Sequence, residues 1–268
     1  MPLSVSNIAW SPAEDAAAFA LLRESGIGHL EVAPGRIWPN AGDTLPEQAA
    51  SPIAALRTEE LSISGFQAIL FGKPDLRLFD ETSRDTLLAY LKRLANLCAA
   101  AGGTYLVFGA PKNRWLPDEV DRESAWETAV TFLRELGNFA ASKGVIFGIE
   151  ANPAAYGCNF CTHVGDVAAL VGEVASPGIG WHLDTGELAM NHEKLPDVIA
   201  ENAGLICSAH VSEPGLGDFT TPWPGHPAVA HALRSAGYSG FVSLEMKRPE
   251  NGLDGVRTAI DFLRAIYT

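Results

Sequence analysis

The sequence predicts a single (β/α)8 barrel, the TIM barrel fold, in which one domain covers residues 1–268. Strand-like apolar runs alternate with helix-like stretches eight times along the chain, as expected of a parallel sheet with helical crossovers. The length of 268 residues is close to the ~250 that are typical of this barrel. A doubly wound open sheet is the structural alternative, but no Gly-x-Gly-x-x-Gly turn follows the first strand, so dinucleotide binding has little support.

The first half of the chain contains four of the expected units. Strands are expected at residues 5–9, 29–33, 61–69 and 104–108. The run Ser11-Pro12-Ala13-Glu14 has the form of a capping box with proline at the first helical position, so a helix should extend from it to residue 25. Further helices are expected over 46–59, where Pro52 could interrupt the helix, and over 80–101 and 119–142, where apolar residues recur at three- and four-residue spacing.

The second half contains four strands that each end in a side chain able to bind a metal. The strands are expected at residues 145–150, 179–184, 206–210 and 241–245, with helices over 164–174, 193–202, 227–236 and 252–267. The strand ends, each followed within a few residues by proline or glycine, present Glu150, Asp184, His210 and Glu245. In a barrel the functional groups lie at the carboxyl ends of the strands, so these four side chains should face a common space.

A group of inward-facing carboxylates like this one predicts a bound cation. Without one the carboxylates would repel each other, and some of their pKa values would rise. Three carboxylates and one imidazole form a mostly oxygen ligand set that suits one divalent ion, Mn²⁺, Mg²⁺ or Co²⁺, with Zn²⁺ also able to bind. The competing reading is structural, because Glu245 could pair with Lys247 and His210 could be a core histidine satisfied by a backbone carbonyl.

Composition excludes several classes of partner. A formal net charge of −13 argues against nucleic acid, whose affinity for proteins comes largely from Lys and Arg. No uninterrupted run of about 20 apolar residues occurs, so no membrane-spanning helix is expected. The start of the chain lacks the features of a secretory signal, and the four cysteines do not form a disulfide framework, so we expect a cytoplasmic protein with reduced thiols.

Motifs around the four strand ends carry a resemblance to a known family. The runs GIEANP at 148–153, HLDTG at 182–186, HVSE at 210–213 and SLEM at 243–246 are similar to the metal-site motifs of the xylose isomerase-like barrel superfamily. The chain resembles in particular the sugar phosphate isomerase/epimerase branch, which includes ketose 3-epimerases. The similarity extends from the first strand to the last helix, and AGYSGF at 236–241 is also typical of the branch.

The resemblance implies a divalent-metal-dependent isomerase or epimerase that acts on a sugar or sugar phosphate. The ion, held by Glu150, Asp184, His210 and Glu245, would chelate two adjacent oxygens of the sugar and stabilise an enediolate. Glu150 and Glu245 would act as the acid/base pair on opposite faces of the reacting carbon, so that the proton returns to the same carbon or to its neighbour. Because barrels of this group often dimerise, a homodimer is also implied.

Substrate recognition is expected to differ from that of ketose epimerases. These relatives usually carry a histidine three residues after the metal-binding aspartate, where this chain has Glu187. The candidate partners for substrate hydroxyl groups are Asn152, Glu187, Glu213 and His226. His182, also a candidate substrate-binding residue, lies on the same face of its strand as Asp184 and is expected deeper in the barrel as a supporting partner. Cationic residues near the predicted top face, any of which could bind a phosphate or carboxylate, are Arg36, Lys112, Arg114, Lys247 and Arg248.

Three other functions compete with the isomerase or epimerase. A metal-dependent dehydratase of a cyclic polyol ketone or keto acid could use the same enolate and expel a β-hydroxyl group. An endonuclease of the abasic-site repair type would need further histidine ligands on the third and fourth strands, where the chain offers Phe66-Gln67 and Phe108-Gly109. A metal-free binding protein could keep the barrel without turnover.

Overall fold

The computed structural model describes residues 1–194 and 196–268, and its strands close into a barrel. All neighbouring strands pair in parallel and in chain order, and β8 closes the ring against β1, for example through Leu3 and Val242. The predicted (β/α)8 barrel is therefore confirmed. The strands are β1 (Leu3–Ser6), β2 (His29–Val32), β3 (Ser62–Phe66), β4 (Tyr105–Phe108), β5 (Ile146–Glu150), β6 (Ile179–Asp184), β7 (Ile206–Val211) and β8 (Val242–Leu244).

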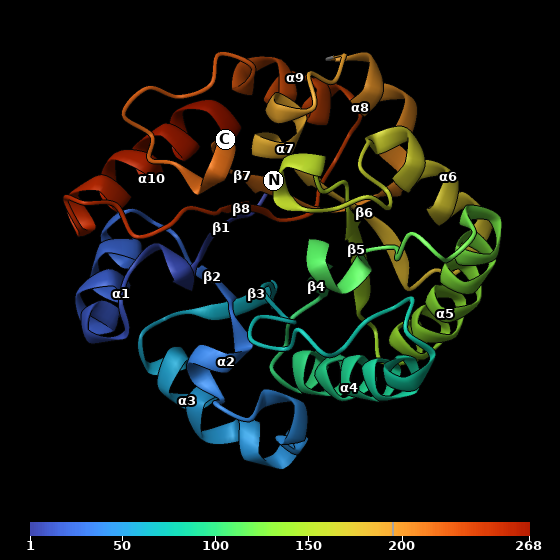
Figure 1. Ribbon diagram of the computed structural model, residues 1–268. Coiled ribbons are helices and arrows are strands. Elements are labelled where there is room, and N and C mark those ends of the chain that lie inside the picture. Colours follow the sequence, from blue (N-terminus) through green and yellow to red (C-terminus); the bar gives the residue numbers. More distant parts are fainter. Residues whose placement is uncertain (195) are drawn as a thin grey trace.

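Helices form a ring around the strands (Figure 1). They are α1 (Asp15–Glu24), α2 (Pro34–Ile37), α3 (Ala50–Thr58), α4 (Glu81–Ala100), α5 (Arg122–Ser142), α6 (Val164–Val174), α7 (Thr185–Met190), α8 (Asp197–Asn202), α9 (His226–Ser235) and α10 (Leu253–Tyr267). The apolar stripe predicted for α4 is buried, as Leu87, Leu91 and Leu94 have no exposed surface. In the part of the chain that the structure describes, no helix is long and apolar enough to cross a membrane.

Side-chain caps define where several helices begin. Glu14 accepts hydrogen bonds from the backbone N–H and the hydroxyl of Ser11, at 2.9 and 2.7 Å, which confirms the predicted capping box. Asp80 caps α4 and Asp121 caps α5 in the same manner, by accepting from backbone N–H groups of the first turn. Pro52 does not interrupt α3, because it lies in the first turn, where its missing N–H has no helical partner to lose.

Three predicted elements differ from the structure. The strand expected at 5–9 lies instead at Leu3–Ser6, and Asn7–Ala9 form a short 3-10 helix. The strand expected at 61–69 ends at Phe66, and the chain then turns through Ala68, which has a positive φ of 50°. The helix expected at 193–202 is confined to α8, and residue 195 of that range lies outside the described residues. A separate short helix, α7, follows β6 directly because the Asp184 side chain caps its first turn.

Polar side chains fill part of the barrel interior. The Tyr105 hydroxyl donates to Glu31 at 2.6 Å and lies 2.9 Å from the Ser243 hydroxyl, and Ser4 lies 2.8 Å from Ser64. All of these residues are buried. Since barrel interiors are usually packed with branched apolar side chains, this polar network indicates that the interior supports a charged site above it.

Candidate metal centre

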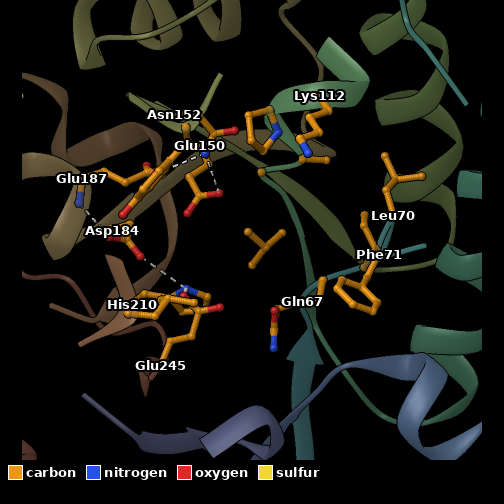
Figure 2. A pocket seen from close by; sticks show the side chains of 18 of the residues that line it. Gln67, Leu70, Phe71, Lys112, Glu150, Asn152, Asp184, Glu187, His210 and Glu245 are labelled. Atoms are coloured by element: carbon orange, nitrogen blue, oxygen red, sulfur yellow. Dashed lines mark hydrogen bonds and ion pairs between the residues drawn. The ribbon is translucent and has the colours of Figure 1, made fainter. Parts of the chain in front are cut away.

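A cavity of about 710 Å³ opens at the carboxyl-terminal end of the barrel (Figure 2). Its walls are formed by the segments 67–74 after β3 and 107–113 at the end of β4, and by residues that follow β5 to β8. Its floor contains the predicted strand-end side chains Glu150, Asp184, His210 and Glu245. The structure thus brings together the four residues that the sequence pattern selected.

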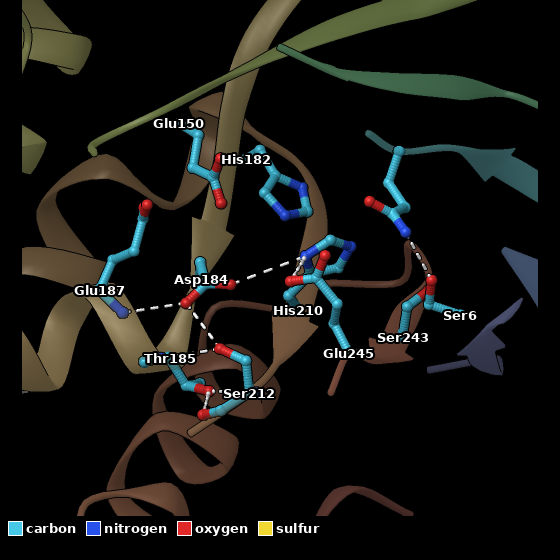
Figure 3. Close-up of polar contacts among 12 residues, drawn as sticks. Ser6, Glu150, His182, Asp184, Thr185, Glu187, His210, Ser212, Ser243 and Glu245 are labelled. Atoms are coloured by element: carbon cyan, nitrogen blue, oxygen red, sulfur yellow. Dashed lines mark hydrogen bonds and ion pairs between the residues drawn. The ribbon is translucent and has the colours of Figure 1, made fainter. Parts of the chain in front are cut away.

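His210 is the centre of this acidic floor (Figure 3). Its Nδ1 lies 3.1 Å from Oε2 of Glu245 and 3.6 Å from Oδ2 of Asp184. The other oxygen of Asp184 is held by its surroundings, because Oδ1 accepts hydrogen bonds from the Ser212 hydroxyl at 2.7 Å and from the Glu187 backbone N–H at 2.9 Å. Asp184 therefore has one anchored oxygen and one that faces the cluster.

A group of four residues on this floor could hold a metal ion. Glu150, His182, Asp184 and His210 each offer one ligand atom, and these atoms all lie within 4.8 Å of one another. Nδ1 of His182 lies 2.7 Å from the Ser208 hydroxyl. Among the described residues, Nε2 of His182 and Nδ1 of His210 are buried without a hydrogen-bond partner. Two unpartnered imidazole nitrogens beside carboxylates fit a divalent cation.

Histidine 182 thus lies closer to the ion-competent group than the sequence suggested. It was expected as a deeper supporting partner, whereas the structure includes one of its ring nitrogens among the four clustered ligand atoms. Glu245, expected as a ligand, contacts the same group through His210. The two alternative sets share Glu150, Asp184 and His210, so these three residues are the common part of both.

Glu31, at the end of β2, is a residue that the sequence reasoning missed. It is fully buried, and both of its carboxylate oxygens lie 2.8 Å from Nε2 of His210. This contact holds the imidazole with Nε2–H toward Glu31 and Nδ1 toward the acidic floor, the arrangement usual for histidines that bind metals. Glu31 lies within the predicted strand 29–33 and stands three residues before Pro34, as Glu150 stands three residues before Pro153, so spacing to the next proline could have found it.

The pKa values of the cluster reflect crowding of negative charge. Burial, and then the charges of Asp184 and Glu245, raise the pKa of Glu150 to about 8. Burial also raises the pKa of Glu245. Burial opposes a charge on His210, yet the Glu31 and Glu245 carboxylates raise its pKa well above the ordinary value. The floor thus attracts positive charge, which either protons or a divalent ion can supply.

A second network links Glu150 to the predicted substrate residues Asn152 and Glu187. The Asn152 amide donates to Glu187 at 2.6 Å and to Glu150 at 3.1 Å. The Arg114 guanidinium donates to the Asn152 side chain at 2.5 Å and to the Glu150 backbone carbonyl at 2.8 Å. Oε2 of Glu187 is buried and has no hydrogen-bond partner among the described residues, although Glu187 lines the cavity. It is therefore available to a bound molecule.

Other predicted substrate residues are engaged by the protein itself. The Glu213 carboxylate accepts from the Trp223 backbone N–H at 3.0 Å and lies 2.9 Å from Nε2 of His226. Nδ1 of His226 in turn lies 2.9 Å from the Tyr267 hydroxyl. Arg36 forms an ion pair with Asp15 at 2.8 Å. Glu213 and Lys247 line the cavity, whereas His226 and Arg36 are not among the described residues that line it.

Comparison by sequence identifies the family. Residues 19–266 match the family model of the xylose isomerase-like TIM barrel, so the chain belongs to this family. A comparison with curated proteins found no significant match. The family membership agrees with the resemblance seen in the strand-end motifs.

Solved structures of sugar epimerases have the same fold. D-psicose 3-epimerase from Clostridium cellulolyticum H10, solved with D-tagatose, has a TM-score of 0.82 at 18% identity, covering 100% of this chain and 99% of the other. The 3-keto-D-glucoside 4-epimerase of E. coli has a TM-score of 0.78 at 19% identity, with 99% of each chain covered. The IolI protein with a bound zinc atom has a TM-score of 0.71 at 18% identity, covering 99% and 96%. At these identities the likeness is one of fold.

Proposed function

We propose that this protein is a divalent-metal-dependent isomerase or epimerase that acts on a small sugar or sugar derivative. The observation that carries the proposal is the position of Glu150 and Glu245, which face one cavity from two sides of an ion-competent cluster (Figure 2). The family membership and the fold shared with two sugar epimerases support it.

Glu150, Asp184 and His210 would hold the ion, with Glu245 or His182 completing the set. When bound, a divalent cation supplies a Lewis acid that polarises a sugar carbonyl and stabilises the negative charge of an enediolate. Asp184 is anchored by Ser212, and His210 is oriented by Glu31, so both side chains are in place before an ion arrives. Such preorganisation favours tight binding and accurate orientation of the substrate.

Glu150 and Glu245 would move the proton. A carboxyl group with a raised pKa holds a proton more readily and so can return one to a carbanion, and the pKa of Glu150 is raised to about 8. The Asn152 amide and the backbone contact of Arg114 keep Glu150 oriented toward the cavity. If one carboxylate removes a proton and the other protonates the opposite face of the same carbon, the product is an epimer. Return of the proton to the neighbouring carbon gives the aldose–ketose isomer.

Solvent deuterium exchange tests this proposal. Protein loaded with Mn²⁺ or Co²⁺ is incubated in D₂O with a panel of ketoses, and NMR follows deuterium incorporation at the carbon next to the carbonyl. We expect exchange with at least one sugar and its loss in Glu150→Gln and Glu245→Gln. The control is Glu135→Gln, because Glu135 is exposed and pairs with Lys92 outside the cavity. Release of a dehydrated product would replace the proposal with a dehydratase.

A further inference from the structure

Half of the chain's lysines line a single cavity. The sequence contains six lysines, and Lys73, Lys112 and Lys247 all belong to the lining of the pocket above the acidic floor. They come from three separate parts of the fold, since they follow β3, β4 and β8. In a chain with a net charge of −13, this gathering of positive charge is a local exception.

The three cavity lysines are exposed, and within the part of the chain that the structure describes none has an acidic partner. Among the described residues, none of them forms an ion pair, although Lys247 donates to the Gly215 carbonyl at 3.0 Å and Lys73 lies 5.5 Å from the centre of the Tyr90 ring. Lys92, on the outer helix α4, instead pairs with Glu135 at 2.6 Å. The positive charges at the cavity are therefore available to an incoming anion.

The cavity has two chemically different sides. Figure 2 shows Lys112 across the cavity from Asp184 and His210, on the same side as Leu70 and Phe71. Phe71 is 90% exposed although it lines the cavity, so this wall offers apolar surface to a carbon chain. The acidic side chains of the lining stand at or after the ends of β5 to β8, whereas Lys73 and Lys112 follow β3 and β4, so the two signs of charge come from different parts of the ring. A molecule whose reacting end faces the acidic floor would thus meet positive charge at its other end.

We propose that the substrate carries an anionic group, a phosphate or a carboxylate, at the end remote from the reacting carbons, and that Lys73, Lys112 and Lys247 bind this group. The inference rests on the proposed function for the reacting end of the molecule. A cavity of about 710 Å³ lies within the range usual for sites that enclose whole small molecules. There is therefore room for both ends of the substrate.

D-fructose and two derivatives that differ from it only at carbon 6 test the inference. D-fructose, D-fructose 6-phosphate and D-fructuronate carry a hydroxyl, a phosphate and a carboxylate there, and calorimetry measures their affinities for metal-loaded protein. We expect at least one anionic sugar to bind about tenfold more tightly than D-fructose, and added salt to weaken only the anionic sugars. The sugar that binds better distinguishes phosphate from carboxylate. Equal binding of all three, or binding of no anionic sugar, overturns the inference.

Lysine variants locate the anion-binding groups. The triple variant K73Q/K112Q/K247Q is expected to lose the preference for the anionic sugar and to keep its affinity for Mn²⁺. The control is Lys92→Gln, which removes a lysine charge outside the cavity and should change neither affinity. Retention of the anionic preference in the triple variant would assign it to other groups and overturn the inference.

The two proposals can fail separately. If no sugar exchanges deuterium, but the anionic preference is present and is lost in the triple variant, the proposed reaction is wrong and the anion site stands. If D-fructose exchanges deuterium and binds as tightly as its phosphate, the proposed reaction stands and the anion site is wrong.

Discussion

The molecule contains two buried glutamate–histidine pairs that differ in one respect. His226 contacts Glu213 and Tyr267, both at 2.9 Å, so each of its ring nitrogens has a partner. His210 contacts Glu31 at 2.8 Å through Nε2, whereas its Nδ1 lies 3.1 Å from a Glu245 oxygen and has no partner with hydrogen-bond geometry among the described residues. Both pairs are buried, so burial alone does not identify a site. The free ring nitrogen beside carboxylates distinguishes a candidate ligand from a structural contact.

Removing a carboxylate beside the Glu31–His210 pair should have the largest effect on metal affinity. Asp184→Asn is expected to lower the affinity for Mn²⁺ by more than about 100-fold, because it removes a charge that faces the cluster while leaving the Ser212 contact possible. Metal analysis after dialysis and calorimetry measure the loss. Unchanged metal affinity in this variant would show that the cluster is not the metal centre.

Weakening the contact that orients His210 should have a smaller effect on the same quantity. Glu31→Gln is expected to lower Mn²⁺ affinity by about 10–100-fold, as is usual for partners of metal-binding histidines. Tyr105→Phe, which removes only the hydroxyl that donates to Glu31, serves as the milder comparison. The optical spectrum of the Co²⁺ form should change in Glu31→Gln, since the imidazole would lose its fixed orientation. Identical spectra would contradict the orienting role.

Breaking the Glu213–His226 pair should affect stability and not metal binding. Glu213→Gln weakens contacts to the Trp223 backbone and to His226, and we expect a loss of about 1–3 kcal/mol in the free energy of unfolding. Denaturant unfolding measures this loss, and calorimetry should show wild-type Mn²⁺ affinity. A fall in metal affinity as large as that of Glu31→Gln would remove the distinction between the two pairs.

The pH dependence of stability should be a weaker signature of the acidic cluster beside His210. The pKa of Glu150 is raised from 4.5 to about 8 in the folded protein, so folding favours its protonated form. Its contribution to stability is therefore complete below 4.5 and is lost as the pH rises through about 8. The melting temperature of metal-free protein should fall across this window. The fall should be smaller in Glu150→Gln and in protein saturated with Mn²⁺, and equal slopes in all three would contradict the assignment.

The sequence alone determined the barrel and the four strand-end side chains. Strand and helix periodicity, caps and chain breakers are local signals, and Glu150, Asp184, His210 and Glu245 each stood just before a proline or glycine. Parallel strands bring their carboxyl ends to one edge, so a common site followed from the fold. The predicted ends of the first and third strands and of the helix after the sixth strand are misplaced. The exact end of an element depends on contacts such as the Asp184 side chain that caps the start of α7.

Only the tertiary structure decided which polar groups were free. Glu31 and His210 are separated by 179 positions, and no local pattern joins them. Glu213 and His226 are predicted substrate partners, and the fold brings their polar atoms into contact with Trp223 and Tyr267, which no local pattern foretold. The fold also leaves Nε2 of His182 without a hydrogen-bond partner among the described residues, in a side chain that belongs to the ion-competent group. Hydrogen-bond satisfaction is a property of the assembled fold, because most partners of a buried side chain lie far away in the sequence.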